Sequence, residues 1–381
     1  MKKLLISILT IVLSACGTMA ERNVSIKSES MNPLNESGLR FWDEYSPSDE
    51  NYRTIEQLKY LNYYSHNKSE VNYLAISGGG VDGAFAAGIL NAWTDKGDRP
   101  DFDVVTGIST GAIVSIFAFL GSNYDDELAK YYTQSSLNEI FKRNSLLKLP
   151  FKASIMNTDG FENEVRTFVD DTIISKIAAE RDKGRILLIA TTNLDNEKMS
   201  IWDIGRIAQI KTENSKKLIQ DIIIASSSIP GLFPAKPIFI ESDSVIYEEL
   251  HVDGGVSRQV FLFPQWLGEA VPSLTSHKKN VYVIRNGQAK PKFEAIDNSI
   301  SSISIRALSI LTRRQGVGDV EFIYNYTKSN NMMFNFAHID DDLVGDGLDT
   351  MSKDYMNAVY HYGYDNMLND MLWLTTPPAM N

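Results

Sequence analysis

The chain has 381 residues, of which 43% are hydrophobic, so it can bury a sizeable core as one large α/β domain or two smaller ones. Its 48 acidic residues outnumber the 37 basic ones, which gives a formal net charge of -11. This acidic balance argues against a nucleic-acid partner and against electrostatic adhesion to anionic lipid. The single cysteine excludes an intramolecular disulfide framework.

The first residues have the pattern of an export signal. Residues 1–3 (Met-Lys-Lys) form a charged start, and residues 4–13 form an apolar run that ends in Leu-Ser-Ala-Cys. About ten apolar residues are too few to span a bilayer, so residues 1–15 are expected to be a signal peptide rather than an anchor. Leu-Ser-Ala-Cys resembles the lipobox of bacterial lipoproteins, which implies that Cys16 is lipidated and begins the mature chain. The alternative is an ordinary secretory signal with an incidental cysteine.

Residues 16–51 are rich in Ser, Asn and Glu and show no sustained apolar period, so a lipidated N-terminus and flexible tether are expected there. A flexible chain of this length spans roughly 30 Å root-mean-square. The residue after the cysteine is Gly17, whereas enteric lipoproteins that stay in the inner membrane often have aspartate at that position. The glycine therefore favours the outer membrane of a bacterial envelope. Residues 52–381 are expected to form one domain, with a helix at 52–64 on its edge.

An apolar strand at 71–77 runs directly into a glycine-rich turn, and a helix is expected at 84–93. Gly78, Gly80 and Gly83 have the G-x-G-x-x-G spacing of a dinucleotide-binding turn. The same turn can instead present successive backbone N–H groups to an oxyanion. A dinucleotide site needs an acidic residue at the end of the second strand, where this chain has a serine, so the oxyanion role is favoured.

That serine, Ser109, lies between an apolar strand at 103–107 and an apolar helix at 110–120. A serine at a sharp strand-to-helix turn has strained backbone angles, and small residues two positions before and after it let the helix pack closely. Gly107 and Gly111 meet that requirement. Ser109 would also lie at a helix N-terminus, whose positive dipole end favours a developing oxyanion. The pattern therefore predicts a nucleophile.

A candidate base follows in the later part of the chain. The apolar pattern first predicts two further buried strands and a helix, at 185–192, 199–203 and 218–226. Another strand, 245–253, then ends on Asp253, which is followed by Gly254 and Gly255. A carboxylate at a strand end, with glycines behind it that let another backbone approach, suits a general base for the serine.

Three motifs in this order resemble the patatin-like phospholipase family: a glycine-rich oxyanion loop (78–83), a G-x-S-x-G serine (107–111) and an Asp-Gly-Gly aspartate (253–255). Residues 225–234 also resemble the family's segment before the aspartate, and the match covers roughly 72–257. The resemblance implies a three-layer α/β/α fold with a mainly parallel central sheet. It also implies a Ser-Asp dyad that hydrolyses acyl esters of membrane lipids without a histidine, a metal or an organic cofactor.

Carried over residue by residue, the resemblance makes Ser109 the nucleophile and Asp253 the base. The oxyanion loop comprises Gly78, Gly79, Gly80, Val81 and Gly83. Within this loop, the backbone amides expected to donate to the oxyanion are those of Gly79, Gly80 and Val81.

Asp82 departs from the family, many of whose members have arginine or lysine at this position. A negative charge there is expected to weaken the site or to select less anionic substrates. Asp82 is also the one residue that points to a different class of protein, a catalytically silent lipoprotein that binds lipid or a partner.

The histidines leave one enzymatic alternative open. A Ser-His-Asp esterase would need a late histidine, and His277 and His338 are the candidates. His338 follows the apolar residues 333–337 and is expected to end a strand. His251 shares a strand face with Asp253, so it either tunes that carboxyl group or packs without a catalytic part.

Three further patterns carry no assigned chemistry. The aspartates within 340–349 lack the ligand spacing of a calcium-binding loop, so a solvated acidic loop and no metal are expected. Residues 349–374 are expected to form a C-terminal helix that covers the sheet. Apolar residues between 120 and 149 are expected to extend the core, with short helices over a lipid cleft as the alternative.

Overall fold

The computed structural model describes residues 22–44, 69–134, 142–143, 156–242, 244–263, 278–343, 348–350 and 352–378. The expected signal peptide, Cys16, the helix at 52–64 and His277 lie outside these residues. Within the described residues, no helix combines the length and the apolar character needed to cross a membrane.

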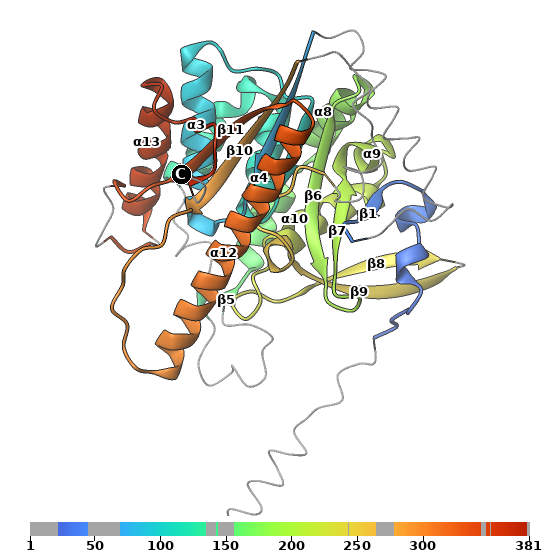
Figure 1. The fold of residues 1–381 in the computed structure, drawn as a ribbon. Coiled ribbons are helices and arrows are strands. Elements are labelled where there is room, and N and C mark those ends of the chain that lie inside the picture. Colours follow the sequence, from blue (N-terminus) through green and yellow to red (C-terminus); the bar gives the residue numbers. More distant parts are fainter. Residues whose placement is uncertain are drawn as a thin grey trace, which may run out of the picture.

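A nine-stranded sheet forms the centre of the molecule (Figure 1). Its middle strands run parallel in the order β6 (Ile186–Asn193), β3 (Val104–Gly107), β2 (Glu70–Ile76), β10 (Lys278–Gln288) and β11 (Met333–Ile339). Antiparallel strands complete the sheet on the β6 side: β7 (Lys198–Asp203), β1 (Arg40–Trp42), β9 (Val245–Asp253) and β8 (Lys236–Ser242). A separate short pair joins β4 (Lys142–Arg143) to β5 (Met156–Asn157). The mainly parallel centre confirms the expected fold class.

Helices cover both faces of this sheet and give three layers. One face carries α12 (Ile300–Ser329), which crosses in front of the sheet in Figure 1. The other face carries α3 (Gly83–Lys96), α4 (Thr110–Leu120), α8 (Asp171–Asp182), α9 (Ile204–Gln209) and α10 (Glu213–Ser226). Along β2, Leu74 and Ile76 join the core under α3 and α4, whereas Ala75 joins the core under α12. Because both faces are buried, the parallel strands are apolar almost throughout.

Two outer helices bear on the remaining expectations. In α5 (Asp125–Gln134), Leu128 and Tyr132 are buried in the main core, as the core interpretation expects, whereas Tyr131 of the same helix lines an apolar cavity, as the alternative expects. The C-terminal helix, α13 (Lys353–Leu368), is shorter than the predicted 349–374 because Ser352 caps its first turn and the chain leaves the helix at Asn369. It packs mainly on α3 rather than on the sheet, so the expected position was wrong as well.

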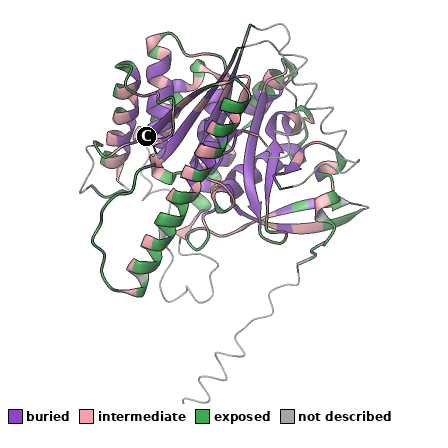
Figure 2. Ribbon diagram, viewed as in Figure 1, coloured by how far each residue is buried: buried purple, intermediate pink, exposed green. Residues whose placement is uncertain are grey.

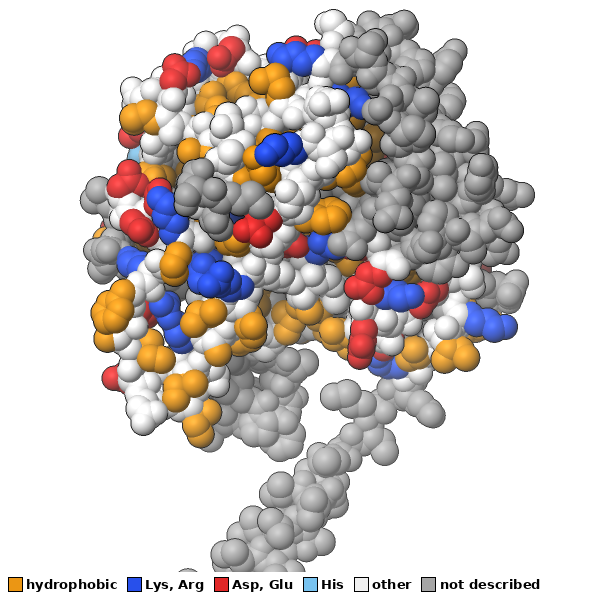
Figure 3. Space-filling view, viewed as in Figure 1, with side chains coloured by type: hydrophobic (Ala, Val, Ile, Leu, Met, Phe, Trp, Pro, Cys, Tyr) orange, Lys and Arg blue, Asp and Glu red, His pale blue; other side chains and the backbone are white. Residues whose placement is uncertain are grey.

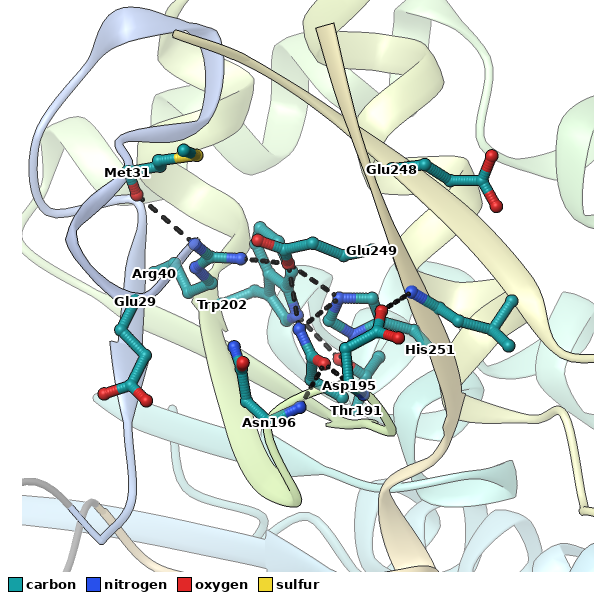
Figure 4. Close-up of polar contacts among 12 residues, drawn as sticks. Glu29, Met31, Arg40, Thr191, Asp195, Asn196, Trp202, Glu248, Glu249 and His251 are labelled. Atoms are coloured by element: carbon teal, nitrogen blue, oxygen red, sulfur yellow. Dashed lines mark hydrogen bonds and ion pairs between the residues drawn. The ribbon is translucent and has the colours of Figure 1, made fainter. Parts of the chain in front are cut away.

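Residues 22–44 form defined structure, which differs from the flexible tether expected in this part of 16–51, whereas residues 16–21 and 45–51 lie outside the described residues. They form two 3-10 turns and then β1, which pairs with β7. The Arg40 guanidinium donates from Nη1 to Glu249 Oε2 at 2.5 Å, with both side chains almost fully buried (Figure 4). Because breaking a buried ion pair is costly, this contact holds the N-terminal segment on β9, the strand that ends on Asp253.

Candidate active site

Ser109 lies at the sharp turn between β3 and α4, as the sequence predicts. Its backbone angles are φ 56° and ψ -126°, a conformation that is strained for a residue with a side chain. The residue caps the N-terminus of α4, and only 6% of its surface is exposed. The position therefore combines a fixed hydroxyl with the positive end of a buried helix.

The glycines around Ser109 are required by close backbone contacts. A Cβ atom on Gly111 would lie 2.4 Å from the carbonyl oxygen of Ile76 at the end of β2. A Cβ atom on Gly107 would lie 2.3 Å from the carbonyl oxygen of Gly111. Any side chain at either position would push α4 away from the sheet, and the turn that presents Ser109 would open.

Asp253 reaches Ser109 because of how the strands pair. It stands opposite Thr191 on β6, and β6 lies beside β3 in the sheet. The Ser109 hydroxyl lies beside the Asp253 carboxyl group and lowers its pKa, and this carboxyl group also accepts from the N–H of Gly255 at 2.7 Å. Gly254, the next residue after Asp253, packs against β6, where a Cβ atom would lie 2.6 Å from the carbonyl oxygen of Ala190.

Burial gives Asp253 the protonation behaviour of a base that works near neutral pH. It raises the pKa of the carboxyl group from the ordinary 3.8 to about 6, while the hydrogen bonds from Ser109 and Gly255 oppose the rise. A carboxylate with this pKa is ionised at pH 7 and still basic enough to take a proton from a serine as a bond forms.

The glycine-rich turn after β2 lies against the serine, since a Cβ atom on Gly78 would be 3.2 Å from Ser109 Cβ. The N–H of Gly78 donates to the carbonyl of Gln259 at 3.0 Å, and the N–H of Gly83 donates to the carbonyls of Gly80 and Val81. The N–H groups of Gly79, Gly80 and Val81 donate to no described residue. Of the five loop residues named from the sequence, these three are available to an oxyanion.

The structure adds two supporting residues that motif reading missed. Ser226 Oγ accepts from the N–H of Ser109 at 2.9 Å and donates to the carbonyl of Ala190 at 2.8 Å, so it fixes the turn that carries Ser109. Gln259 accepts from Gly78 through its carbonyl and donates from Nε2 to the carbonyl of Gly255, which links the loop to the Asp253 turn. Ser226 lies in the segment that resembles the family, whereas no sequence pattern singles out Gln259.

The Asp82 side chain is bound by the C-terminal helix. Tyr355, in the first turn of α13, donates its hydroxyl to Asp82 Oδ1 at 2.9 Å. Burial raises the pKa of Asp82 to about 6, and the Tyr355 hydrogen bond opposes that rise. Asp82 is therefore held by a neutral partner and carries its charge only above about pH 6.

Neither described candidate histidine reaches the Ser109 and Asp253 pair. His338 lies one residue before the end of β11, close to the predicted strand end, but β2 and β10 lie between β11 and β3, a separation of about 14 Å at ordinary strand spacing. Its Nδ1 donates to the carbonyl of Ile339. His251 bonds to Glu249 Oε2 at 3.0 Å and to Thr191 Oγ1 at 2.9 Å, beside Arg40 (Figure 4). Burial lowers the pKa of His251, so the ring is neutral and supports the Arg40 and Glu249 pair.

The acidic stretch near the C-terminus shows ordinary ion pairs and hydrogen bonds. Asp340 pairs with Lys290 at 2.7 Å, and Asp342 accepts from the hydroxyl of Tyr362. Across the parts of the chain that the structure describes, no three His, Cys, Asp or Glu side chains are grouped so that they could hold a metal ion.

Two cavities adjoin the elements that carry these residues. One, of about 580 Å³, is lined largely by apolar side chains from α4, α5, α10 and α7 (Asp159–Phe168). The other, of about 710 Å³, lies between the glycine-rich turn, the end of β10 and α12. Gly78 and Gly79 form part of the wall of this second cavity.

A parallel α/β sheet with a serine at a strand-to-helix turn, an aspartate beside it and a loop whose amides donate to no described residue defines a hydrolase-type site. The family profile described as "Patatin-like phospholipase" matches residues 74–264, which include all three motifs. The chain therefore belongs to the patatin-like phospholipase family, a family of lipid ester hydrolases.

Similar proteins from other sources were also found. An uncharacterized protein, R571, of Acanthamoeba polyphaga mimivirus is 26% identical over 220 residues, which are 56% of this chain and 69% of that protein. The crystal structure of VipD from Legionella pneumophila is 10% identical with a TM-score of 0.40, over 80% of this chain and 67% of VipD. Human GIVD cytosolic phospholipase A2 is 10% identical with a TM-score of 0.30, over 80% of this chain and 52% of that protein.

Proposed function

We propose that this protein is a lipid acyl hydrolase in which Ser109 is the nucleophile and Asp253 the general base. The observation that carries the proposal is the buried Asp253 carboxyl group, which lies beside Ser109 with a pKa of about 6, next to a loop in which three backbone amides donate to no described residue. The test is release of fatty acid from phospholipid and from a short-chain p-nitrophenyl ester by the purified protein, and a protein inactive on both would favour a silent binding lipoprotein.

In this mechanism Ser109 Oγ attacks the ester carbonyl carbon and its proton passes to Asp253. The oxyanion is held by the N–H groups of Gly79, Gly80 and Val81, aided by the N-terminal end of α4. Collapse expels the alcohol, which takes the proton back from Asp253. Asp253 then removes a proton from a water molecule that attacks the acyl-enzyme, and the fatty acid leaves with Ser109 restored.

The apolar cavity is positioned to take the acyl chain. Ile113, in its wall, lies four residues after Ser109 and therefore on the same face of α4, one turn below the nucleophile. Ile223, also in the wall, lies three residues before Ser226 on α10, the serine that accepts from the Ser109 N–H. Both helices thus lead from the site to the cavity, and a hydrocarbon chain gains about 0.8 kcal/mol for each methylene buried there.

Filling this cavity is expected to shorten the acyl chains that the enzyme prefers. Asn163 is exposed on α7 and lines the cavity, so Asn163→Trp places a large ring in it without disturbing the core. We expect the ratio of kcat/KM for a hexadecanoyl ester to that for a butanoyl ester to fall about tenfold. Ser175→Trp, at an exposed position on α8 outside the cavity, is the matched control. An unchanged ratio in Asn163→Trp would place the acyl chain elsewhere.

We also propose that the protein works on a membrane surface. The N-terminal half of α12 projects from the body of the molecule with its apolar side chains in solvent (Figures 1 and 2). Ile300 is 88% exposed, Leu308 63% and Leu311 65%. Figure 3 shows this apolar surface beside Lys and Arg side chains, an arrangement suited to an interface of acyl chains and anionic headgroups. Acylation of Cys16 in a bacterial outer membrane, inferred from the lipobox alone, would hold the domain near that surface.

Rates on phospholipid vesicles can separate the contribution of the Cys16 acyl anchor from that of the apolar surface of α12. We expect the lipidated protein to hydrolyse vesicle lipid faster than the Cys16→Ser variant does. Adding Leu308→Ser and Leu311→Ser to the Cys16→Ser variant should lower its rate on vesicles about tenfold further. The rate on a monomeric short-chain ester should change far less. Ile246→Ser, at a 60% exposed position on β9, is the control for loss of an exposed apolar side chain. Equal losses in control and α12 variants would contradict docking through α12.

A further inference from the structure

The cavity beside the oxyanion loop is strongly basic in an acidic protein. Its wall contains two acidic residues, Asp82 and Asp341. The basic residues in its wall are Arg285, Lys292, Arg306, Arg313 and Arg314. Three of them come from α12 and one from the end of β10, although the whole chain carries a net charge of -11. Local positive charge of this kind selects anions.

Three of these arginines have no carboxylate partner. Arg306 is neutralised by Glu294 at 2.7 Å, but no carboxylate of the described residues lies within 4.0 Å of Arg285, Arg313 or Arg314. Among the described residues, Arg313 donates only to the carbonyl of Ala289, at 3.3 Å. Although the protein is acidic, these three arginines therefore have guanidinium N–H donors that no described carboxylate occupies, all in the wall of one cavity.

Arg285 is the most unusual member of the group because it is buried, with 5% of its surface exposed. It donates from Nε to the carbonyl of Gln288 at 3.2 Å and from Nη2 to the carbonyl of Arg313 at 3.5 Å, and its Nη1 has no acceptor among the described residues. Burial lowers the pKa of Arg285 to about 10, so the guanidinium remains charged at pH 7. The charge of Asp319 opposes this fall in the pKa, but Asp319 is already paired with Arg258 at 3.1 Å, so an anion bound beside Arg285 would further offset the cost of burying its charge.

Helix α12 is shaped to admit this guanidinium. A Cβ atom on Gly316 would lie 1.6 Å from Arg285 Nη1, so no other residue fits there while Arg285 keeps its position. Glycine within a helix costs about 1 kcal/mol of stability relative to alanine. At Gly316 this cost leaves the space that the Arg285 guanidinium occupies. Gly318, two residues further on the same helix, has nothing within 4 Å of its Cβ position.

We propose that Arg285, Arg313 and Arg314 bind the phosphate of the substrate's head group while its ester lies at Ser109. Guanidinium groups bind phosphate oxygens through paired N–H donors, and a phosphate in a glycerophospholipid lies only a few bonds from the ester carbonyl. Gly78 and Gly79 belong both to this cavity and to the oxyanion loop, so the two sites are adjacent. Asp82 lies in the same cavity wall, so this proposal and the expectation that Asp82 selects less anionic substrates make opposite predictions. The inference rests on the proposed function only in placing the ester at Ser109.

Binding can be measured without catalysis in the Ser109→Ala protein. Isothermal titration would use dihexanoylphosphatidylglycerol below its micelle concentration, dihexanoylglycerol and inorganic phosphate as separate ligands. We expect the phospholipid to bind at least about tenfold more tightly than either other ligand, and Arg313→Gln with Arg314→Gln to remove that difference. Gly316→Ala, which displaces Arg285, should weaken phospholipid binding, whereas Gly318→Ala and Lys328→Gln, outside the cavity, should not.

The hydrolytic arm uses the same substitutions in the enzyme with Ser109 intact. The ratio of kcat/KM for the phospholipid to that for the diacylglycerol should fall about tenfold in the double arginine variant, through KM. Equal binding of phospholipid and diacylglycerol, or binding indifferent to the arginines, would overturn the head-group site even if hydrolysis is found. Inorganic phosphate binding as tightly as the phospholipid would reassign the cavity to the free ion. Arginine-dependent lipid binding without any hydrolysis would support the site and contradict the proposed function.

Discussion

Replacing Ser109 by alanine is expected to lower kcat by about 10⁴-fold or more on every ester that the wild-type protein hydrolyses, because no other group can form the acyl-enzyme. The loss should leave the fold intact, since the hydroxyl is a small part of the turn and its backbone N–H keeps Ser226 as acceptor. Initial rates on p-nitrophenyl butyrate and on phospholipid measure it.

The matched control is Ser115→Ala on the same helix. Ser115 is fully buried and its hydroxyl donates only to the carbonyl of Ala112, so its removal should cost stability and little activity. Thermal unfolding of both variants shows whether each is folded. Activity within tenfold of wild type in folded Ser109→Ala would exclude Ser109 as the nucleophile.

Asp253→Asn is expected to abolish turnover and yet to stabilise the folded protein at high pH. The pKa of Asp253 is raised from 3.8 to about 6 in the folded state, so the carboxylate destabilises that state above pH 6 and has no such effect below pH 3.8. The rise in the pKa of Asp253 from 3.8 to about 6 corresponds to a loss of about 3 kcal/mol in the free energy of unfolding, as an upper estimate. Asparagine carries no charge, so the gain in unfolding free energy should be largest at pH 8 and smaller at pH 5. A variant that is less stable than wild type at both pH values would contradict this account of Asp253.

The same pKa sets the pH dependence of the reaction. Because the base must be ionised, kcat/KM should rise between pH 5 and pH 7 and then level off, with an apparent pKa of about 6. Asp82 titrates in the same range, so Asp82→Asn is the necessary control. The rise should persist in Asp82→Asn, and its disappearance there would transfer the titration from Asp253 to Asp82.

The parts of the site that the sequence predicts are those encoded by neighbouring residues. The strained turn at Ser109 needs Gly107 and Gly111, and both are visible within five letters of sequence. The ends of β2, β3 and β9 were likewise marked by the change from apolar residues to glycine. Locating Asp253 beside Ser109 needed the resemblance to the family, because their strands are linked only through β6.

What the sequence does not reveal depends on long-range packing. β1 has three residues, too few to show a strand period, and its Arg40 is fixed by Glu249, which is 209 positions away. Arg285 and Arg313 meet because α12 lies across β10, and nothing in their local sequences sets them apart from surface arginines. The expectation for Asp82 did not consider these arginines, because the local sequence does not show that they lie in the same cavity wall as Asp82.

The most direct test of the proposed dyad is covalent labelling with a long-chain alkyl fluorophosphonate, followed by mass spectrometry. A nucleophilic serine attacks the phosphorus and displaces fluoride, so the label marks the residue that forms the acyl-enzyme. We predict one adduct per chain on the peptide that contains Ser109, slower labelling in Asp253→Asn and none in Ser109→Ala. Labelling of a different serine, or equal labelling of folded Ser109→Ala, would contradict the assignment of Ser109 as the nucleophile.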